Sequence, residues 1–134
     1  MKKIEHIGIA VSNLKEAAKT YEILMQEKPY KTENVESEGV TTLFFKSGES
    51  KIELLAATND NSPIAKFIAK KGEGIHHIAF SVEDIDTEIE RLKSEGYQII
   101  SDQPKNGADN KRIVFLHPKS NHGVLVELCQ ERTD

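Results

Sequence analysis

The chain contains the same short pattern twice. Residues 4–14 read IEHIGIAVSNL and residues 75–85 read IHHIAFSVEDI, and every large apolar position matches at an offset of 71. Residues 52–55 (IELL) and 126–129 (VELC) match at an offset of 74, and a loop insertion explains the difference. Such internal similarity indicates two copies of one supersecondary unit. Each half therefore opens on a segment with a histidine and closes on a segment with a glutamate.

Helix signals follow the opening segment of each half. Asn13 is a predicted helix cap, with Glu16 three residues later as in a capping box. Asp84 is the predicted cap in the second half, and Gly96 stands where a glycine that ends a helix belongs. Ser62-Pro63 predicts the start of a connector helix between the halves. The first helix has apolar residues at helical spacing: Leu14, Ala17, Ala18, Tyr21, Leu24 and Met25.

Extended segments are expected after each of the two long helices. They are predicted at residues 40–45, 51–55, 97–100, 112–116 and 124–128. Each half is thus a strand, a helix and then two or three strands, which predicts an α+β fold. We expect a single domain over residues 1–134, with modules at about 1–58 and 74–130 and a connector helix at about 62–71.

Composition excludes several classes of function. The chain has 134 residues and a net charge of -4, so no overall attraction to nucleic acid or to an anionic membrane is expected. No apolar run approaches the roughly 20 residues that cross a bilayer. Cys129 is the one cysteine, so an internal disulfide is excluded and a reducing compartment is favoured. A packed, unreactive role is expected for Cys129, and we expect a cytoplasmic protein without membrane or nucleic-acid partners.

The two histidine segments predict a face with room for a ligand. Side chains alternate along a strand, so His6 shares a face with Gly8, and His77 shares a face with Ala79. The large apolar residues lie on the opposite faces and should pack on the helices. The small residues should leave open volume beside each histidine. His76 shares the face of the large apolar residues, so His77, and not His76, corresponds to His6.

The closing segments each place one carboxylate among apolar residues. Glu53 and Glu127 lie at equivalent positions of the repeat, as His6 and His77 do. A buried carboxylate needs a cation or a network of hydrogen bonds. Two imidazoles and two carboxylates suit one divalent ion in an open shell. Without a thiolate, a closed structural zinc site is not expected. Donor types alone leave cobalt, manganese, nickel, iron, magnesium and zinc open.

These features resemble the vicinal oxygen chelate superfamily (the glyoxalase, bleomycin resistance and dioxygenase proteins), and within it the methylmalonyl-CoA epimerases. The resemblance runs from Ile4 to Leu128. It rests on HIGIAVSNL (6–14), KIELL (51–55), SPIAKFIAKKGEGIHHIAFSVEDI (62–85) and FLHPKSNHGVLVEL (115–128). It implies two βαβββ modules that form an incomplete barrel around a metal, which is commonly cobalt, and a homodimer.

The resemblance also implies an activity and roles for residues. The implied reaction interconverts (R)- and (S)-methylmalonyl-CoA by removal and return of the α-proton through a metal-stabilised enolate. Glu127 is expected to be a metal ligand and a base. Some family members carry a second base on the strand at residues 40–45, which has no carboxylate here, so Glu53 or Glu38 is left for that role. The implied contacts to the substrate carboxylate or a CoA phosphate come from Lys119-Ser120.

Three other functions fit part of the pattern. A glyoxalase I-like lactoylglutathione lyase uses the same fold and a His/Glu/His/Glu ligand set, which suits Glu53. A ring-cleaving dioxygenase needs iron with two histidines and one carboxylate, and Glu53 would occupy one of its open positions. A binding module without activity would often lack ligands, whereas all four candidates are present. The long epimerase-like stretches favour the epimerase.

Overall fold

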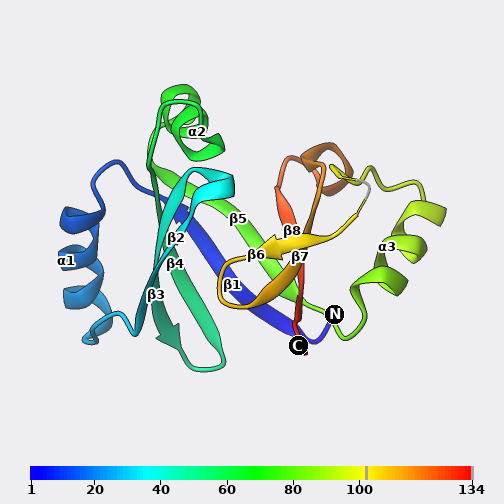
Figure 1. The fold of residues 1–134 in the computed structure, drawn as a ribbon, viewed down its shortest axis with the longest axis horizontal. Helices are drawn as coiled ribbons and strands as arrows, with labels where there is room; N and C mark the ends of the chain where they lie inside the picture. Colours follow the sequence, from blue (N-terminus) through cyan, green and yellow to red (C-terminus); the bar gives the residue numbers. More distant parts are fainter. Residues whose placement is uncertain (102, 134) are drawn as a thin grey trace. The chain divides into compact units, whose positions relative to one another are not determined.

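The computed structural model describes residues 1–101 and 103–133 and divides into two compact units, His6–His76 and Met1–Glu5 with His77–Asp134 (Figure 1). The first half contains β1 (Lys3–Ala10), α1 (Leu14–Met25), β2 (Lys31–Val35), η1 (Glu36–Glu38), β3 (Val40–Ser47), β4 (Ser50–Ala57) and α2 (Pro63–Lys71). The second half contains β5 (Gly74–Ser81), α3 (Ile85–Ser94), β6 (Lys105–Gly107), β7 (Lys111–Leu116), η2 (Pro118–Asn121) and β8 (Val126–Glu131). The predicted α+β class and the tandem βαβββ order are confirmed.

Strands of the first half lie in the order β2-β3-β4-β1, with β1 parallel to β4 and the other pairs antiparallel. One face of these strands packs against α1 through a cluster that includes Leu43, Phe45 and Leu54. The adjacent Leu55 points to the other face, where it packs with Ile64 of α2. The first half therefore has a helix on each face of its strands.

Strands of the second half lie in the order β5-β8-β7-β6, with β5 parallel to β8. Alternate residues of β7 and β8, among them Val114 and Leu128, pack with Ile85 and Ile89 of α3. Burial of this stripe is what fixes α3 on the sheet, because most stability of an amphipathic helix comes from packing of its apolar face. The opposite face of the same strands is free of α3 and carries Glu127 on β8.

Helix boundaries follow the predicted signals. The Asn13 side chain accepts a hydrogen bond from the Glu16 backbone N–H at 3.0 Å, and that of Asp84 accepts one from Thr87 at 3.2 Å. Pro63 begins α2 as predicted. Gly96, which follows α3, has φ 89°, a conformation that glycine adopts without strain.

Two expected segments differ from the structure, and two strands were not expected. Residues 97–100 form no strand but a single bridge between Ile99 and Leu116, because the Tyr97 N–H still bonds to the end of α3 at Leu92. β8 begins at Val126, since residue 124 is held in a turn by Asn121. Two short edge strands, β2 and β6, were not located in the sequence because they are polar on both faces or only three residues long.

Leu24 also departs from expectation. It was placed in the apolar stripe of α1, but it is 69% exposed, whereas Tyr21 and Met25 pack against the sheet. Leu24 stands in the last turn at the edge of the stripe, where no strand residue reaches it in the first-half core. None of the helices in the described part of the chain combines the length and the apolar character that a bilayer crossing needs.

Candidate functional site

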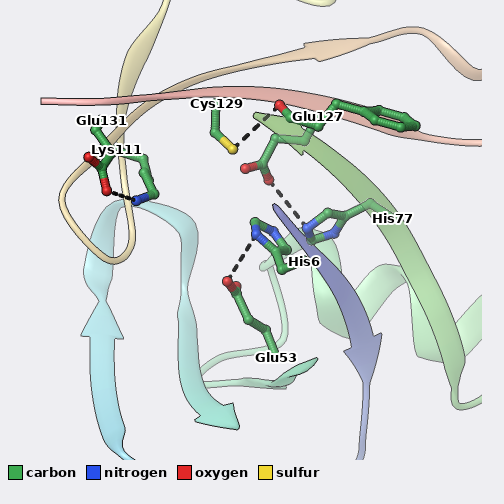
Figure 2. A network of polar contacts seen from close by, with 8 residues as sticks. His6, Glu53, His77, Lys111, Glu127, Cys129 and Glu131 are labelled. Carbon is green, nitrogen blue, oxygen red and sulfur yellow. Dashed lines mark hydrogen bonds and ion pairs between the residues drawn. The ribbon is translucent and has the colours of Figure 1, made fainter. Parts of the chain in front are cut away.

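The first half of the chain contains a buried histidine–glutamate pair. His6 lies on β1 and Glu53 on β4, and these strands run parallel, with Gly8 opposite Glu53. His6 Nδ1 lies 3.0 Å from Glu53 Oε2, and both residues are 4% exposed (Figure 2). The contact is therefore diagonal, because the glutamate stands opposite the residue two positions after the histidine.

The second half contains the same arrangement. His77 lies on β5 and Glu127 on β8, again parallel, with Ala79 opposite Glu127. His77 Nε2 lies 3.2 Å from Glu127 Oε1, and the two residues are 5% and 4% exposed (Figure 2). The His77 ring stands nearly perpendicular to the ring of Phe115 on β7, with ring centres 5.6 Å apart. The repeat seen in the sequence therefore recurs as a repeated strand register that pairs a histidine with a glutamate.

The small residues that share the histidines' faces lie next to the two glutamates. Gly8 and Ala79 stand directly across from the glutamates, so they leave space for each carboxylate to reach the histidine. Further along this face, however, Ala10 is packed against Ile64 of α2. Ala79 itself packs with Cys129. Apolar side chains of each unit therefore fill part of this face, and open volume beside each histidine stays a prediction.

The adjacent histidines of β5 point in opposite directions, as strand parity predicted. His76 is half-buried, and its ring stands edge-on to Phe67 of α2 with ring centres 5.0 Å apart. His77 is buried and pairs with Glu127. The expected difference between the two residues is confirmed at the level of orientation.

The chemistry of each pair fits a divalent cation. Each pair offers an imidazole nitrogen and a carboxylate oxygen in a buried position. A carboxylate away from water requires positive charge or hydrogen bonds, and a neutral imidazole supplies at most one N–H. Nitrogen and carboxylate donors suit borderline-to-hard divalent ions. The buried imidazoles and carboxylates are thus donor types that can hold a metal ion.

The turn before β8 contains Lys119 and Ser120. Lys119 is exposed, and its backbone N–H donates to His117 Nδ1 at 3.1 Å. Ser120 Oγ accepts a hydrogen bond from the Gln98 N–H at 3.0 Å. Ser120 therefore supports the segment after α3, and its hydroxyl proton is still a donor, because a hydroxyl both donates and accepts.

Two charged residues outside the expected site are buried, and their burial was not predicted from the sequence. Glu5 is 3% exposed and Lys111 is 7% exposed, although both stand in strands next to apolar residues. A charged residue at an inward strand position was the available clue. Cys129 has the packed role that was expected, since it is fully buried and its thiol lies 3.5 Å from the Phe80 carbonyl oxygen.

Comparison with known proteins extends over nearly the whole chain. Residues 5–115 match the Glyoxalase/Bleomycin resistance protein/Dioxygenase superfamily. The ethylmalonyl-CoA/methylmalonyl-CoA epimerase of Cereibacter sphaeroides is 41% identical over 130 residues, which cover 96% of this chain and 97% of that protein.

Two solved structures are similar throughout. A hypothetical protein from Bacillus halodurans C-125 is 45% identical, with a TM-score of 0.95 over 98% of this chain and 96% of that one. A methylmalonyl-CoA epimerase variant of Streptomyces coelicolor in complex with 2-nitronate-propionyl-CoA is 34% identical, with a TM-score of 0.93 and 99% of each chain covered.

Proposed function

Because the chain belongs to the glyoxalase/bleomycin resistance protein/dioxygenase superfamily and, within it, to the methylmalonyl-CoA epimerases, we propose that it interconverts (R)- and (S)-methylmalonyl-CoA. The chain is accordingly an isomerase that acts on a CoA thioester. The observation that carries the proposal is the buried histidine–glutamate pair, which recurs with the same strand register in both repeats.

Metal binding is the first part of the proposal. One divalent ion would be held by His6, Glu53, His77 and Glu127, within a single domain of two modules. Two imidazole nitrogens and two carboxylate oxygens support this ligand set, because divalent ions of borderline-to-hard character bind such donors. Cobalt is proposed from the family resemblance, and manganese, nickel, zinc and magnesium also bind such donors. When bound, the ion polarises the thioester oxygen as a Lewis acid.

Proton transfer is assigned to the two glutamates. Inversion requires removal of the α-proton on one face of the substrate and its return on the other, and a carboxylate can act as general base and then as acid. Glu127 is the proposed first base. Glu53 is the proposed second base, because Thr42 and Phe44, which share its face on β3, provide no carboxylate. Glu38 lies outside β3, in the short η1 helix.

Substrate contacts, assembly and location complete the proposal. The Ser120 hydroxyl donates a hydrogen bond to the substrate carboxylate or a CoA phosphate, and the Lys119 ammonium forms an ion pair with the same group. The exposed Lys119 side chain and the unused donor capacity of Ser120 support these roles. We place the enzyme in the cytoplasm as a homodimer, because a single buried cysteine suits a reducing compartment and the family commonly forms dimers.

A glyoxalase I-like lyase is not favoured. That function is supported by Glu53 alone, because its carboxylate suits the His/Glu/His/Glu ligand set of such a lyase. The epimerase of Cereibacter sphaeroides matches 96% of this chain, which outweighs that single residue.

Deuterium exchange at the α-carbon of methylmalonyl-CoA tests the function. In D2O, the metal-loaded protein is expected to convert a single epimer of methylmalonyl-CoA into a mixture of both and to introduce deuterium at the α-carbon, as followed by NMR. The same preparation is offered methylglyoxal and glutathione as the matched control. Methylglyoxal and glutathione form a hemithioacetal. Its consumption without any deuterium exchange into methylmalonyl-CoA would overturn the epimerase assignment.

A further inference from the structure

Lys111 is a buried lysine at the start of β7. The residue is 7% exposed, and it stands opposite Glu131 of β8. Lys111 Nζ lies 3.2 Å from Glu131 Oε1, yet the Glu131 side chain is 83% exposed (Figure 2). A desolvated ammonium requires a compensating anion. Here that anion stands mostly in water, so an incoming anionic group competes with it at little cost.

The side chain of Lys111 lies on the same face as the second histidine–glutamate pair. Alternation along β7 puts Lys111 on one face with Ile113 and Phe115, while the residues between them face α3. Phe115 contacts the His77 ring and stands opposite Glu127. The ammonium and the proposed metal ligands of this unit therefore share one face of the sheet.

The neighbouring cation provides a contrast within the same strand. Arg112 points to the other face, where Nη1 lies 3.2 Å from Asp86 Oδ2 on α3. That ion pair links β7 to the helix, and both of its side chains are partly exposed. The Arg112–Asp86 ion pair thus already holds β7 to α3 on one face of the sheet. Lys111 places a buried charge on the other face, which carries the proposed metal ligands.

Spacing along the strand sets the distance between Lys111 and the proposed metal ligands of this unit. Lys111 precedes Phe115 by four residues, or about 13 Å at ~3.3 Å per residue. The flexible four-carbon stem of lysine spans part of this interval. Methylmalonyl-CoA is an extended molecule with a carboxylate at its acyl end and phosphates in its nucleotide part, so an anionic group of it can lie along this face between the metal ligands and the ammonium.

We propose that Lys111 is a substrate-binding residue that exchanges Glu131 for an anionic group of the CoA thioester. The inference rests on the proposed function and adds to it a residue that recognises the anion. The group is either the methylmalonyl carboxylate or a CoA phosphate, both of which accept charge-assisted hydrogen bonds.

Steady-state kinetics of Lys111→Met test the proposal. KM for methylmalonyl-CoA is expected to rise roughly tenfold to a hundredfold, the range for loss of a charged hydrogen bond. Lys111→Arg keeps the charge and should recover most of the affinity. Arg112→Met removes the same charge from the adjacent position and should leave KM unchanged. Glu131→Gln removes the competing carboxylate, so its KM should be equal to or lower than that of the unmodified enzyme.

A second substrate distinguishes the two anions. Methylmalonyl-pantetheine lacks the phosphates, so a rise in KM of Lys111→Met with both thioesters identifies the carboxylate. A rise with methylmalonyl-CoA alone identifies a phosphate. Unchanged KM with both thioesters, or a Glu131→Gln variant as impaired as Lys111→Met, overturns the proposal and leaves a purely structural ion pair. α-Proton exchange by the unmodified enzyme reports separately on the proposed function.

Discussion

His6 and His77 each reach diagonally across a parallel strand pair to a buried glutamate. The shared parallel register explains why this contact occurs in both halves. Gly8 and Ala79 stand opposite the two glutamates, and neither fills the space between the side chains. The atoms in contact are not the same, since His6 approaches through Nδ1 and His77 through Nε2. Similar strands therefore present their imidazoles in two orientations.

Substitution of adjacent histidines tests this description at the scale of single residues. His77→Ala is expected to weaken metal binding by more than roughly 100-fold, beyond the loss seen when only an outer partner of a ligand is removed. His76→Ala is the control, because its ring packs on Phe67. Its affinity should stay within about threefold, less than 1 kcal/mol. Equal losses in isothermal titration would refute the assignment of His77.

Glu53→Gln separates ligation from proton transfer. The amide oxygen remains a possible ligand, so the metal content should be retained. The amide cannot accept the α-proton, so kcat for epimerisation should fall by about 10²–10⁴-fold, the usual contribution of a general base. A variant with full kcat would show that Glu53 is not the second base, whereas loss of metal would show that its charge is needed for ligation.

The helix caps are the clearest features at the scale of elements. Asn13, Ser62 and Asp84 each accept a hydrogen bond from a backbone N–H of the first turn. Such caps satisfy donors that have no partner within the helix. The Thr87 N–H that bonds to Asp84 lowers the pKa of this carboxyl below its ordinary value of 3.8.

The lowered pKa of Asp84 predicts a pH dependence of stability. A depressed pKa in the folded state stabilises the protein above the ordinary value, and this stabilisation is lost as pH falls through 3.8 and then through the folded pKa. Asp84→Asn keeps a capping oxygen but does not titrate. The unfolding free-energy difference between the two proteins should therefore shrink from neutral pH into this acidic range in urea titrations. A difference that is constant with pH would contradict the cap's charge as its source.

The packing of α1 predicts unequal effects of two leucines. Leu54 of β4 is fully buried beneath α1, so Leu54→Ala should lower the free energy of unfolding by about 2–5 kcal/mol. Leu24 is 69% exposed on α1 itself, and Leu24→Ala should change it by less than about 0.5 kcal/mol. A large loss for Leu24→Ala in urea unfolding would mean that another surface covers this residue.

The sequence repeat predicted much of the whole molecule. It located β1 and β5, the central part of β4 and the first residues of β8, because inward positions of a strand must be apolar at a period of two. It also paired each histidine with the glutamate of its own half. The pattern could not locate β2 and β6, since an edge strand pairs through its backbone and needs no apolar face.

Long-range backbone contacts and buried charges could not be predicted from the sequence repeat. Residues 97–100 read as a strand, but bonds from the end of α3 and from Ser120 hold them in an irregular path. Lys111 was not identified as buried from the sequence, because periodicity does not show which charges are buried beside a partner strand. Tertiary context decided both cases.

Metal stoichiometry tests most directly the central claim that the two repeats serve one ion. Elemental mass spectrometry of freshly purified protein, with the chain concentration determined by amino-acid analysis, should find one divalent ion per chain. The count should fall to near zero in His77→Ala, because each half provides only two of the four donors. Two ions per chain, or one ion that persists in His77→Ala, would contradict the shared site.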